Sequence, residues 1–174
     1  MTTLTIYVGL PGSGKTTFHK RGVNSPPYEN LPIRVSLDDF RMNVLGHEFH
    51  GPSEPIVHAW SKQTVRYLLS LGYDVALDAT NVKKGVRAGY ISIAKECNAE
   101  VEAYEFMTLF EEVLKRNAER ERNVPEEIIL RMMASYEAPW YTEGFDKIYR
   151  VSTEGDVDFC PNEGPGPGAI IAQS

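Results

Sequence analysis

The chain has 174 residues, of which 42% are hydrophobic, and a formal net charge of −6 at pH 7. This length and apolar content predict one globular domain with its own core and leave little room for a second. The negative charge argues against a broad basic surface that grips duplex nucleic acid through many phosphates. No lysine or arginine follows Arg150, so part of the charge belongs to the tail. A short single-stranded or small anionic substrate therefore remains compatible with the composition.

The chain carries no obvious targeting signal. Its opening, MTTLTIYVGL, is too short and too often interrupted by threonine for a signal peptide, and no later run approaches about 18 apolar residues. We therefore expect a cytoplasmic protein without membrane association, whose oligomeric state the sequence leaves open. The separation of Cys97 and Cys160 argues against a disulfide framework or a cysteine-built zinc site.

Strand-like apolar segments alternate with helix-like amphipathic segments along the chain. Val57, Trp60, Thr64 and Leu68, for example, have the spacing of one face of a long helix. Strands separated by helices predict the α/β class, with a parallel sheet covered by helices on both faces. In chain order the expected elements are strand 4–8, helix 15–21, strand 33–35, helix 38–45, helix 54–71, strand 73–78, helix 86–97, strand 101–106, helix 110–122, helix 125–137 and strand 147–151.

The last segment of the chain differs in composition from the rest. From about Gly155 on, it is rich in glycine and proline and contains acidic residues but no basic ones. We therefore expect one domain over residues 1–153, followed by a flexible acidic tail over residues 154–174.

The stretch YVGLPGSGKTT has the spacing Gly9-x-x-x-x-Gly14-Lys15-Thr16 between a predicted strand and a predicted helix. This is the pattern of a phosphate loop, whose glycines let backbone N–H groups and a helix N-terminus face an anion. We expect Lys15 to reach the outer phosphates of ATP or another nucleoside triphosphate, and the Thr16 hydroxyl to help hold Mg²⁺. The spacing, lysine, hydroxyl and context together argue against a plain glycine-rich turn. The expected nucleotide-binding residues of this loop are Gly12, Ser13, Gly14, Lys15, Thr16 and Thr17.

Two acids and an arginine open a predicted helix in the stretch VSLDDFR. Ser36 and Asp39 have the spacing of an N-terminal capping box, which accounts for both. Capping leaves Asp38 optional and Arg41 unfavourable, because a cation near a helix start opposes the helix dipole. In the second interpretation, Asp38 is the base that takes the proton of an acceptor hydroxyl. Arg41 then binds an anionic group of that acceptor, and Asp39 lies on the acceptor side.

The stretch LKRNAERERNVPEEIILRMM places Arg116 and Arg120 four residues apart on one helical face, with Arg122 rotated away. One interpretation is a solvated, salt-bridged surface helix. The other is a helical hairpin, at about residues 110–137, that closes as a lid and brings cations to the transferred phosphate. In that interpretation Arg120 is the better candidate for touching the nucleotide phosphates during catalysis, and Arg116 is the second.

The stretch LDATN ends the most clearly central strand. Asp78, at a carboxyl strand end, is expected to help hold the metal ion through a water molecule. Thr80 and Asn81 either hydrogen-bond the acceptor or cap the next helix. The basic residues that follow either meet a polynucleotide strand or form a solvated face, and we favour the solvated face for Lys83, Lys84 and Arg87.

Four stretches in order, GLPGSGKTT, SLDDFR, DATN and LFEEVLKRNAERERNVPEEIILRMMASY, make residues 3–151 resemble a family of phosphate-loop kinases. That family includes the 5′-kinase domain of bacteriophage polynucleotide kinase. The resemblance implies a parallel sheet in the order 2-3-1-4-5 and transfer of phosphate from ATP to the 5′-hydroxyl of DNA or RNA ends. It also implies that Asp38 is the base, Arg41 the contact to the acceptor's 3′ phosphate, and Arg120 the lid arginine on the donor phosphates.

The chain departs from that family at three points. Phe40 stands where the family has a tyrosine, which we expect to remove a hydroxyl from the acceptor side. Ala79 stands where the phage enzyme has an acid, which leaves Asp78 as the nearest substitute. Asp156-Val157-Asp158 lacks the Gly-Thr that follows in the phage phosphatase domain, so no 3′-phosphatase activity is expected.

Our first hypothesis is therefore an ATP-dependent kinase of nucleic-acid 5′-hydroxyl ends, with single-stranded or end-exposed DNA or RNA as its substrate. The alternatives are a related kinase of another hydroxyl, on a hydroxymethylated base, a nucleoside or a metabolite, and a nucleotide-binding ATPase switch without an acceptor. In the switch, Asp38 and Arg41 would serve only as helix-capping residues.

Overall fold

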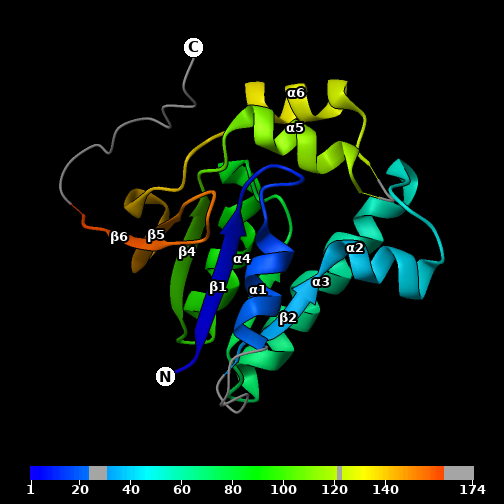
Figure 1. Ribbon diagram of the computed structural model, residues 1–174. Coiled ribbons are helices and arrows are strands. Elements are labelled where there is room, and N and C mark those ends of the chain that lie inside the picture. The colour runs from blue at the N-terminus through cyan, green and yellow to red at the C-terminus, as the bar shows by residue number, and fades with distance from the viewer. Residues whose placement is uncertain (24–30, 121–122, 163–174) are drawn as a thin grey trace.

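The computed structural model describes residues 1–23, 31–120 and 123–162, and one six-stranded sheet forms its centre (Figure 1). The strand order is β2-β3-β1-β4-β5-β6, in which β1 to β5 are parallel and β6 is antiparallel to β5. This confirms the α/β class and the expected order of the first five strands. The strands are β1 (Thr3–Val8), β2 (Ile33–Ser36), β3 (Val75–Asp78), β4 (Glu100–Phe106), β5 (Lys147–Val151) and β6 (Val157–Cys160).

Helices cover both faces of the sheet. Leu4, Ile6 and Val8 of β1 share a core with α3 and α4, whereas Tyr7 packs on the other face with Phe18 of α1. No helix in the described part of the chain is both long and apolar enough to cross a membrane. The helices are α1 (Lys15–Val23), α2 (Leu37–Phe40) with a following π-helical turn η2 (Arg41–Leu45), the short 3₁₀ turn η3 (Gly51–Ser53), α3 (Glu54–Ser70), α4 (Lys84–Glu96), α5 (Phe110–Ala118), α6 (Glu126–Ala134) and the 3₁₀ turn η4 (Tyr141–Glu143).

The expectation of a flexible tail from residue 154 is wrong for residues 157–160, which form β6 at the edge of the sheet. Ile148 pairs with Cys160, and Val151 pairs with Val157. A turn through Gly155, whose φ is +100°, brings the chain back along β5. Without β6, the edge of β5 would expose unpaired backbone N–H and C=O groups. The backbone of residues 157–160 forms hydrogen bonds with these groups, although the residues on either side are polar. Residues 163–174 of the predicted tail lie outside the described residues.

The α5–α6 hairpin lies over the end of the sheet where β1 and β3 finish (Figure 1). On its inner side, Val113 of α5 and Ile129 of α6 pack against Leu10 and Val82, which lie in the loops after β1 and β3. α5 ends at Ala118, four residues before the expected end at Arg122, and residues 121–122 lie outside the described residues. The side-chain amide of Asn117 accounts for the early end: its nitrogen donates to the carbonyl of Val124 at 2.8 Å, and its oxygen accepts from the Val124 N–H at 2.9 Å.

Arg87 was expected either to contact a polynucleotide strand or to belong to a solvated surface. Both interpretations are wrong, because its side chain is buried in the protein. Its exposed fraction is 0%. Its Nε and Nη2 donate to the Glu143 carboxylate at 2.8 and 2.7 Å, and its Nη1 donates to the carbonyl oxygens of Asn81 and Glu137. The guanidinium therefore joins α4 to the segments that follow β3 and α6, with donors matched by acceptors. Lys83 and Lys84 are exposed, as expected.

Candidate active site

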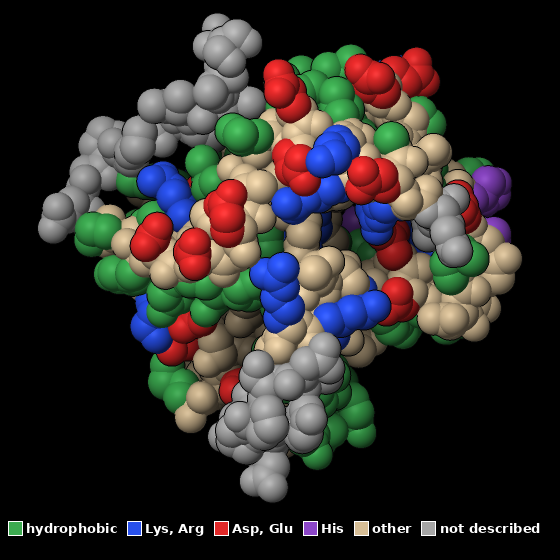
Figure 2. Space-filling view, viewed as in Figure 1, with side chains coloured by type: hydrophobic (Ala, Val, Ile, Leu, Met, Phe, Trp, Pro, Cys, Tyr) green, Lys and Arg blue, Asp and Glu red, His purple; other side chains and the backbone are tan. Residues whose placement is uncertain are grey.

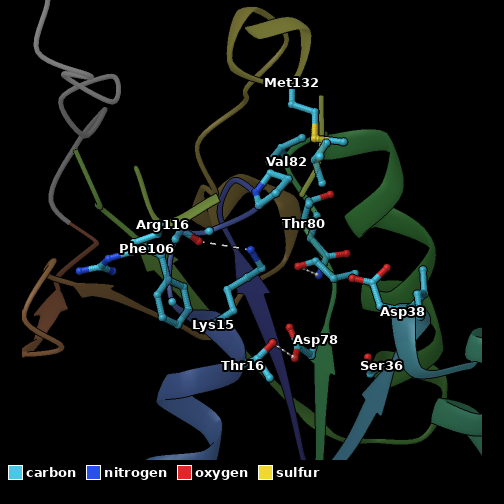
Figure 3. A pocket seen from close by; sticks show the side chains of 18 of the residues that line it. Lys15, Thr16, Ser36, Asp38, Asp78, Thr80, Val82, Phe106, Arg116 and Met132 are labelled. Carbon is cyan, nitrogen blue, oxygen red and sulfur yellow. Dashed lines mark hydrogen bonds between the residues drawn. The ribbon is translucent and has the colours of Figure 1, made fainter. Parts of the chain in front are cut away.

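A cleft of about 1430 Å³ opens at the carboxyl ends of β1, β2 and β3, below the α5–α6 hairpin (Figure 3). Ligands of open parallel sheets bind in this position, because loops and helix N-termini converge there. Figure 2 shows lysine and arginine side chains gathered at the centre of the same face, with acidic side chains among them. The cleft is therefore suited to an anionic ligand held by specific groups rather than by a uniformly basic surface.

The phosphate loop between β1 and α1 has the backbone that its glycines predict. Gly12 and Gly14 have φ angles of +83° and +96°, which other residues adopt only with strain. A Cβ on Gly12 would lie 2.8 Å from the carbonyl oxygen of Val113, so this glycine also lets α5 approach the loop. α1 begins at Lys15, and its N-terminus favours a phosphate group. All the expected nucleotide-binding residues of the loop line the cleft: Gly12, Ser13, Gly14, Lys15, Thr16 and Thr17.

Lys15 folds back onto the loop that carries it. Its Nζ donates to the carbonyl oxygens of Gly9 and Leu10 at 2.8 and 2.7 Å, and to Ser13 Oγ at 3.2 Å. Burial of the ammonium lowers the pKa of Lys15 to about 8. A phosphate group beside it would favour the charged form, so that nucleotide binding and protonation of Lys15 are coupled.

The affinity for a nucleoside triphosphate is expected to fall as the pH rises through about 8. Below this pH Lys15 is charged in the free protein, and above it binding must first take up a proton, which weakens affinity by up to about tenfold per pH unit. Calorimetric titrations from about pH 7 to about pH 9.5, in buffers of different ionisation enthalpy, measure affinity and proton uptake together. AMP, which lacks the outer phosphates, is the control and should show a much weaker slope. Affinity independent of pH, without proton uptake, would contradict the coupling.

Thr16 and Asp78, the two residues predicted to hold the metal ion, meet at the floor of the cleft. Thr16 Oγ1 donates to Asp78 Oδ2 at 2.9 Å (Figure 3). Arg34 Nε donates to the same oxygen at 2.7 Å, and the Arg34 guanidinium also pairs with Asp39. Hydroxyl and carboxylate oxygens are ligands that Mg²⁺ takes beside nucleotide phosphates, so Thr16 and Asp78 fit the expected metal site. No group of three acidic, histidine or cysteine side chains in the described residues is placed to hold a metal, so phosphate and water oxygens would have to complete the coordination.

Asp38 stands on the other wall of the cleft, across from Lys15 (Figure 3). Ser36 caps α2, because its Oγ accepts from the Asp39 N–H at 3.1 Å. The Asp39 carboxylate turns to Arg34 instead of completing the capping box. The side chain of Asp38 is 65% exposed and accepts from Arg41 Nη1 at 2.6 Å. An exposed carboxylate next to a guanidinium is well placed to meet a hydroxyl that enters the cleft.

Arg41 is not the unfavourable cation that its sequence position suggested. It is buried at the junction of α2 and η2, where its Nε and Nη2 donate to the two carboxylate oxygens of Glu54 at 2.8 and 2.7 Å. Hydrogen bonds from Arg41 lower the pKa of Glu54, which therefore stays ionised. Asp38 and Glu54 offset the helix dipole, so the inference from an unexplained dipole cost was wrong. What points to function is instead the position of this fixed arginine beside Asp38 on the cleft wall.

Both arginines of the predicted lid line the cleft. Arg116 Nε donates to Glu112 at 2.7 Å, and a Cβ on Gly14 would lie 3.6 Å from Arg116 Nη1. Arg116 therefore lies against the phosphate loop. Arg120 follows the end of α5 at Ala118 rather than continuing its face, and it is exposed at the rim of the cleft.

Two residues after β3 were expected to contact the acceptor or to cap a helix. Asn81 is buried with a positive φ of 48°, and its Nδ2 donates to the carbonyl oxygen of Tyr7 at 2.8 Å. Its amide nitrogen thus ties the loop to β1 and serves the fold. Thr80 accepts from the Gly9 N–H through its carbonyl oxygen, and its side chain lines the cleft. Thr80 is therefore the better candidate for an acceptor contact.

The phenylalanine at position 40 does not affect the acceptor side, contrary to expectation. Phe40 points into the core, with 7% of its surface exposed, and stacks on Trp60 of α3 with ring centroids 4.0 Å apart. A hydroxyl at this position would meet the core and not the cleft.

Sequence reasoning missed Arg34 and Glu54. Arg34 contacts Asp78, 44 positions away, and Glu54 contacts Arg41, 13 positions away, so neither pair has a local spacing signal. Glu54 looked like an ordinary acid in the first turn of α3, where it favours the helix dipole. For Arg34, the sequence indicated only that an arginine lies in a predicted strand whose end points toward the site.

A family model described as AAA domain matches residues 4–139 of this chain. Among curated proteins, the L-seryl-tRNA(Sec) kinase of Methanococcus maripaludis is 28% identical over 165 residues, which cover 90% of this chain. This chain spans 61% of the length of that relative.

Two solved structures share the fold. Kti12 of Chaetomium thermophilum, in complex with ADP-AlF3, is 19% identical with a TM-score of 0.67, and the match covers 86% of this chain and 88% of that one. A chain of the Pnkp1/Rnl/Hen1 RNA repair complex is 23% identical with a TM-score of 0.63, and the match covers 95% of this chain and 50% of that one. At these identities the likeness is one of fold.

Proposed function

Because this chain belongs to the AAA domain family and has the fold of phosphate-loop kinases, we propose that it transfers the γ-phosphate of ATP to the 5′-hydroxyl end of a DNA or RNA strand. One observation carries the proposal. Asp38 accepts a hydrogen bond from Arg41 at 2.6 Å on the wall of the cleft that faces the phosphate loop. This arrangement offers a base for a hydroxyl and a fixed cation for a phosphate on the same acceptor.

In the proposed reaction, the oxygen of the 5′-hydroxyl forms a bond to the γ-phosphorus of ATP, and Asp38 accepts the proton that this hydroxyl loses. The bond from that phosphorus to the bridging oxygen breaks, and ADP leaves. Lys15, Arg116 and Arg120 stabilise the negative charge that develops on the phosphate oxygens, which is the main contribution of the protein in phosphoryl transfer. Mg²⁺, held by Thr16 and through water by Asp78, would supply further positive charge at the phosphates when bound.

The proposed role of Arg41 is to bind the 3′ phosphate of the terminal acceptor nucleotide. Its Nε and Nη2 are taken by Glu54, so the guanidinium is held in one orientation before the acceptor arrives. A cation fixed in this way loses little side-chain entropy on binding. A 3′ phosphate is present on any strand of two or more nucleotides and absent from a nucleoside.

Replacement of Arg41 by alanine is expected to weaken acceptors that carry a 3′ phosphate by about 10-fold to 100-fold, because a charge-assisted hydrogen bond is lost. A nucleoside acceptor should lose much less. The measurement is kcat/KM for a nucleoside 3′-phosphate and for the matching nucleoside, with wild type and Arg41→Ala. Equal losses for the two acceptors would place Arg41 outside phosphate recognition.

A second candidate function follows from the curated relative, which is named an L-seryl-tRNA(Sec) kinase. In this alternative the acceptor is a serine hydroxyl carried by RNA, and Asp38 would be the base for that hydroxyl instead. The hydroxymethylated base, nucleoside, metabolite and ATPase-switch alternatives have no observation of their own in the cleft.

The test is a comparison of acceptors with γ-labelled ATP: 5′-hydroxyl DNA, 5′-hydroxyl RNA, seryl-tRNA, a nucleoside, and no acceptor. Efficient labelling of either 5′-hydroxyl strand supports the proposal, and the ratio of the two gives the DNA or RNA preference. Labelling of seryl-tRNA alone would favour the second candidate. Release of inorganic phosphate at one rate whether or not an acceptor is added would indicate an ATPase.

A further inference from the structure

The segment between η2 and α3 places an unburied aromatic ring at the edge of the cleft. Phe49 is 69% exposed, and it lines the cleft together with Glu54 and His58. The guanidinium carbon of Arg41 lies 6.0 Å from the centroid of the Phe49 ring. The ring is therefore a direct neighbour of the arginine to which we assign the acceptor phosphate.

The Phe49 ring lies outside the core of this region. Phe40, nine positions earlier, is buried and stacked on Trp60, so the two phenylalanines have different surroundings. Single exposed apolar residues are common on protein surfaces and need no explanation there. Phe49 differs because it stands in the cleft, beside a fixed cation and a carboxylate.

The arrangement of Asp38, Arg41 and Phe49 matches the order of groups in a nucleotide. Arg41 Nη1 contacts Asp38 at 2.6 Å, and the same guanidinium borders the Phe49 ring. In a 5′-terminal nucleotide, the sugar separates the 5′-hydroxyl from the base and carries the 3′ phosphate between them. With the hydroxyl at Asp38 and the phosphate at Arg41, a base on the same sugar is within reach of Phe49, whose ring borders the Arg41 guanidinium.

We propose that Phe49 is a stacking platform for the nucleobase of the 5′-terminal acceptor nucleotide. This inference rests on the proposed function and adds a binding subsite to it. Stacking on an aromatic side chain accepts every base, because each base has a π-face, so the subsite selects for the presence of a base and not for its identity. The charge of Arg41 beside the stacked pair adds a cation–π contribution.

The test compares two 5′-hydroxyl oligonucleotides that differ only at the first nucleotide, which is either normal or abasic. For the wild-type protein, kcat/KM is expected to be about 10-fold higher with the normal oligonucleotide. Phe49→Ala should remove this preference by lowering activity on the normal acceptor while leaving the abasic one unchanged. Phe49→Trp should retain the preference.

Phe159→Ala is the matched control. Phe159 is also an exposed phenylalanine, at 56%, but it lies on β6 at the edge of the sheet opposite to β2. This variant should keep the preference of the wild type, and ATP affinity reports that each variant is folded.

The outcomes separate the subsite from the function. Wild-type activity on both oligonucleotides with no preference for a base, or equal losses in Phe49→Ala on both, would overturn the stacking platform and leave the proposed function standing. No transfer to either oligonucleotide by the wild type would overturn the proposed function, and the subsite with it.

Discussion

Replacement of Asp38 by asparagine is expected to lower the rate of phosphoryl transfer by about 10²–10⁴-fold, while ATP binding changes little. The amide keeps the size of the side chain and can still accept a hydrogen bond from Arg41, but it cannot take the proton of the acceptor hydroxyl. Asp38 lies on the wall of the cleft across from Lys15, and the substitution leaves the phosphate loop itself unchanged. Single-turnover transfer from γ-labelled ATP and calorimetric ATP affinity measure the two quantities separately.

The control for this variant is Asp158→Asn, which makes the same chemical change at an exposed position of β6. It should transfer phosphate at the wild-type rate. If Asp38→Asn also retains the wild-type rate, Asp38 is not the base. A large loss of ATP affinity in Asp38→Asn would instead indicate that the residue supports the nucleotide site.

Replacement of Arg87 by methionine is expected to lower the free energy of unfolding by about 3–5 kcal/mol. Arg87 and Glu143 form an ion pair with side-chain exposures of 0% and 3%, and the guanidinium also binds carbonyl oxygens. Methionine fills much of the volume but leaves a buried carboxylate without its partner. Urea-induced unfolding followed by circular dichroism measures the change.

Arg66→Met is the matched control, because Arg66 pairs with Glu96 on the surface, with side-chain exposures of 42% and 53%. Exposed ion pairs contribute little to stability. The two variants should therefore differ widely in their urea midpoints. Similar midpoints would mean that water or a neighbouring cation compensates Glu143 once Arg87 is gone, and the buried pair would then have no special role in the fold.

The phosphate loop and the central strands were predictable because their signals are local. The glycines, Lys15 and Thr16 lie within one short stretch, which stands between a strand and a helix that the sequence also marks. The meeting of Thr16 with Asp78 was predictable as well, because carboxyl ends of parallel strands share one edge of the sheet. The order of the strands came from the family resemblance and not from the pattern alone.

The acceptor side of the cleft was less predictable, because its contacts join distant segments. Arg41 looked anomalous in sequence only because its partner Glu54 comes from the next helix, beyond an irregular segment. Arg87 looked like a surface residue for the same reason, since Glu143 is 56 positions away. A charged residue that finds a partner through the fold cannot be told from a solvated one by spacing.

The central claim is most directly tested by locating the label after reaction of γ-labelled ATP with a 5′-hydroxyl oligonucleotide. Digestion to mononucleotides should place the label in the 5′-phosphate of the terminal nucleotide. An oligonucleotide already phosphorylated at its 5′ end should remain unlabelled, and Asp38→Asn should label neither strand appreciably. Label found only in inorganic phosphate, or at any position other than the 5′ end, would contradict the account.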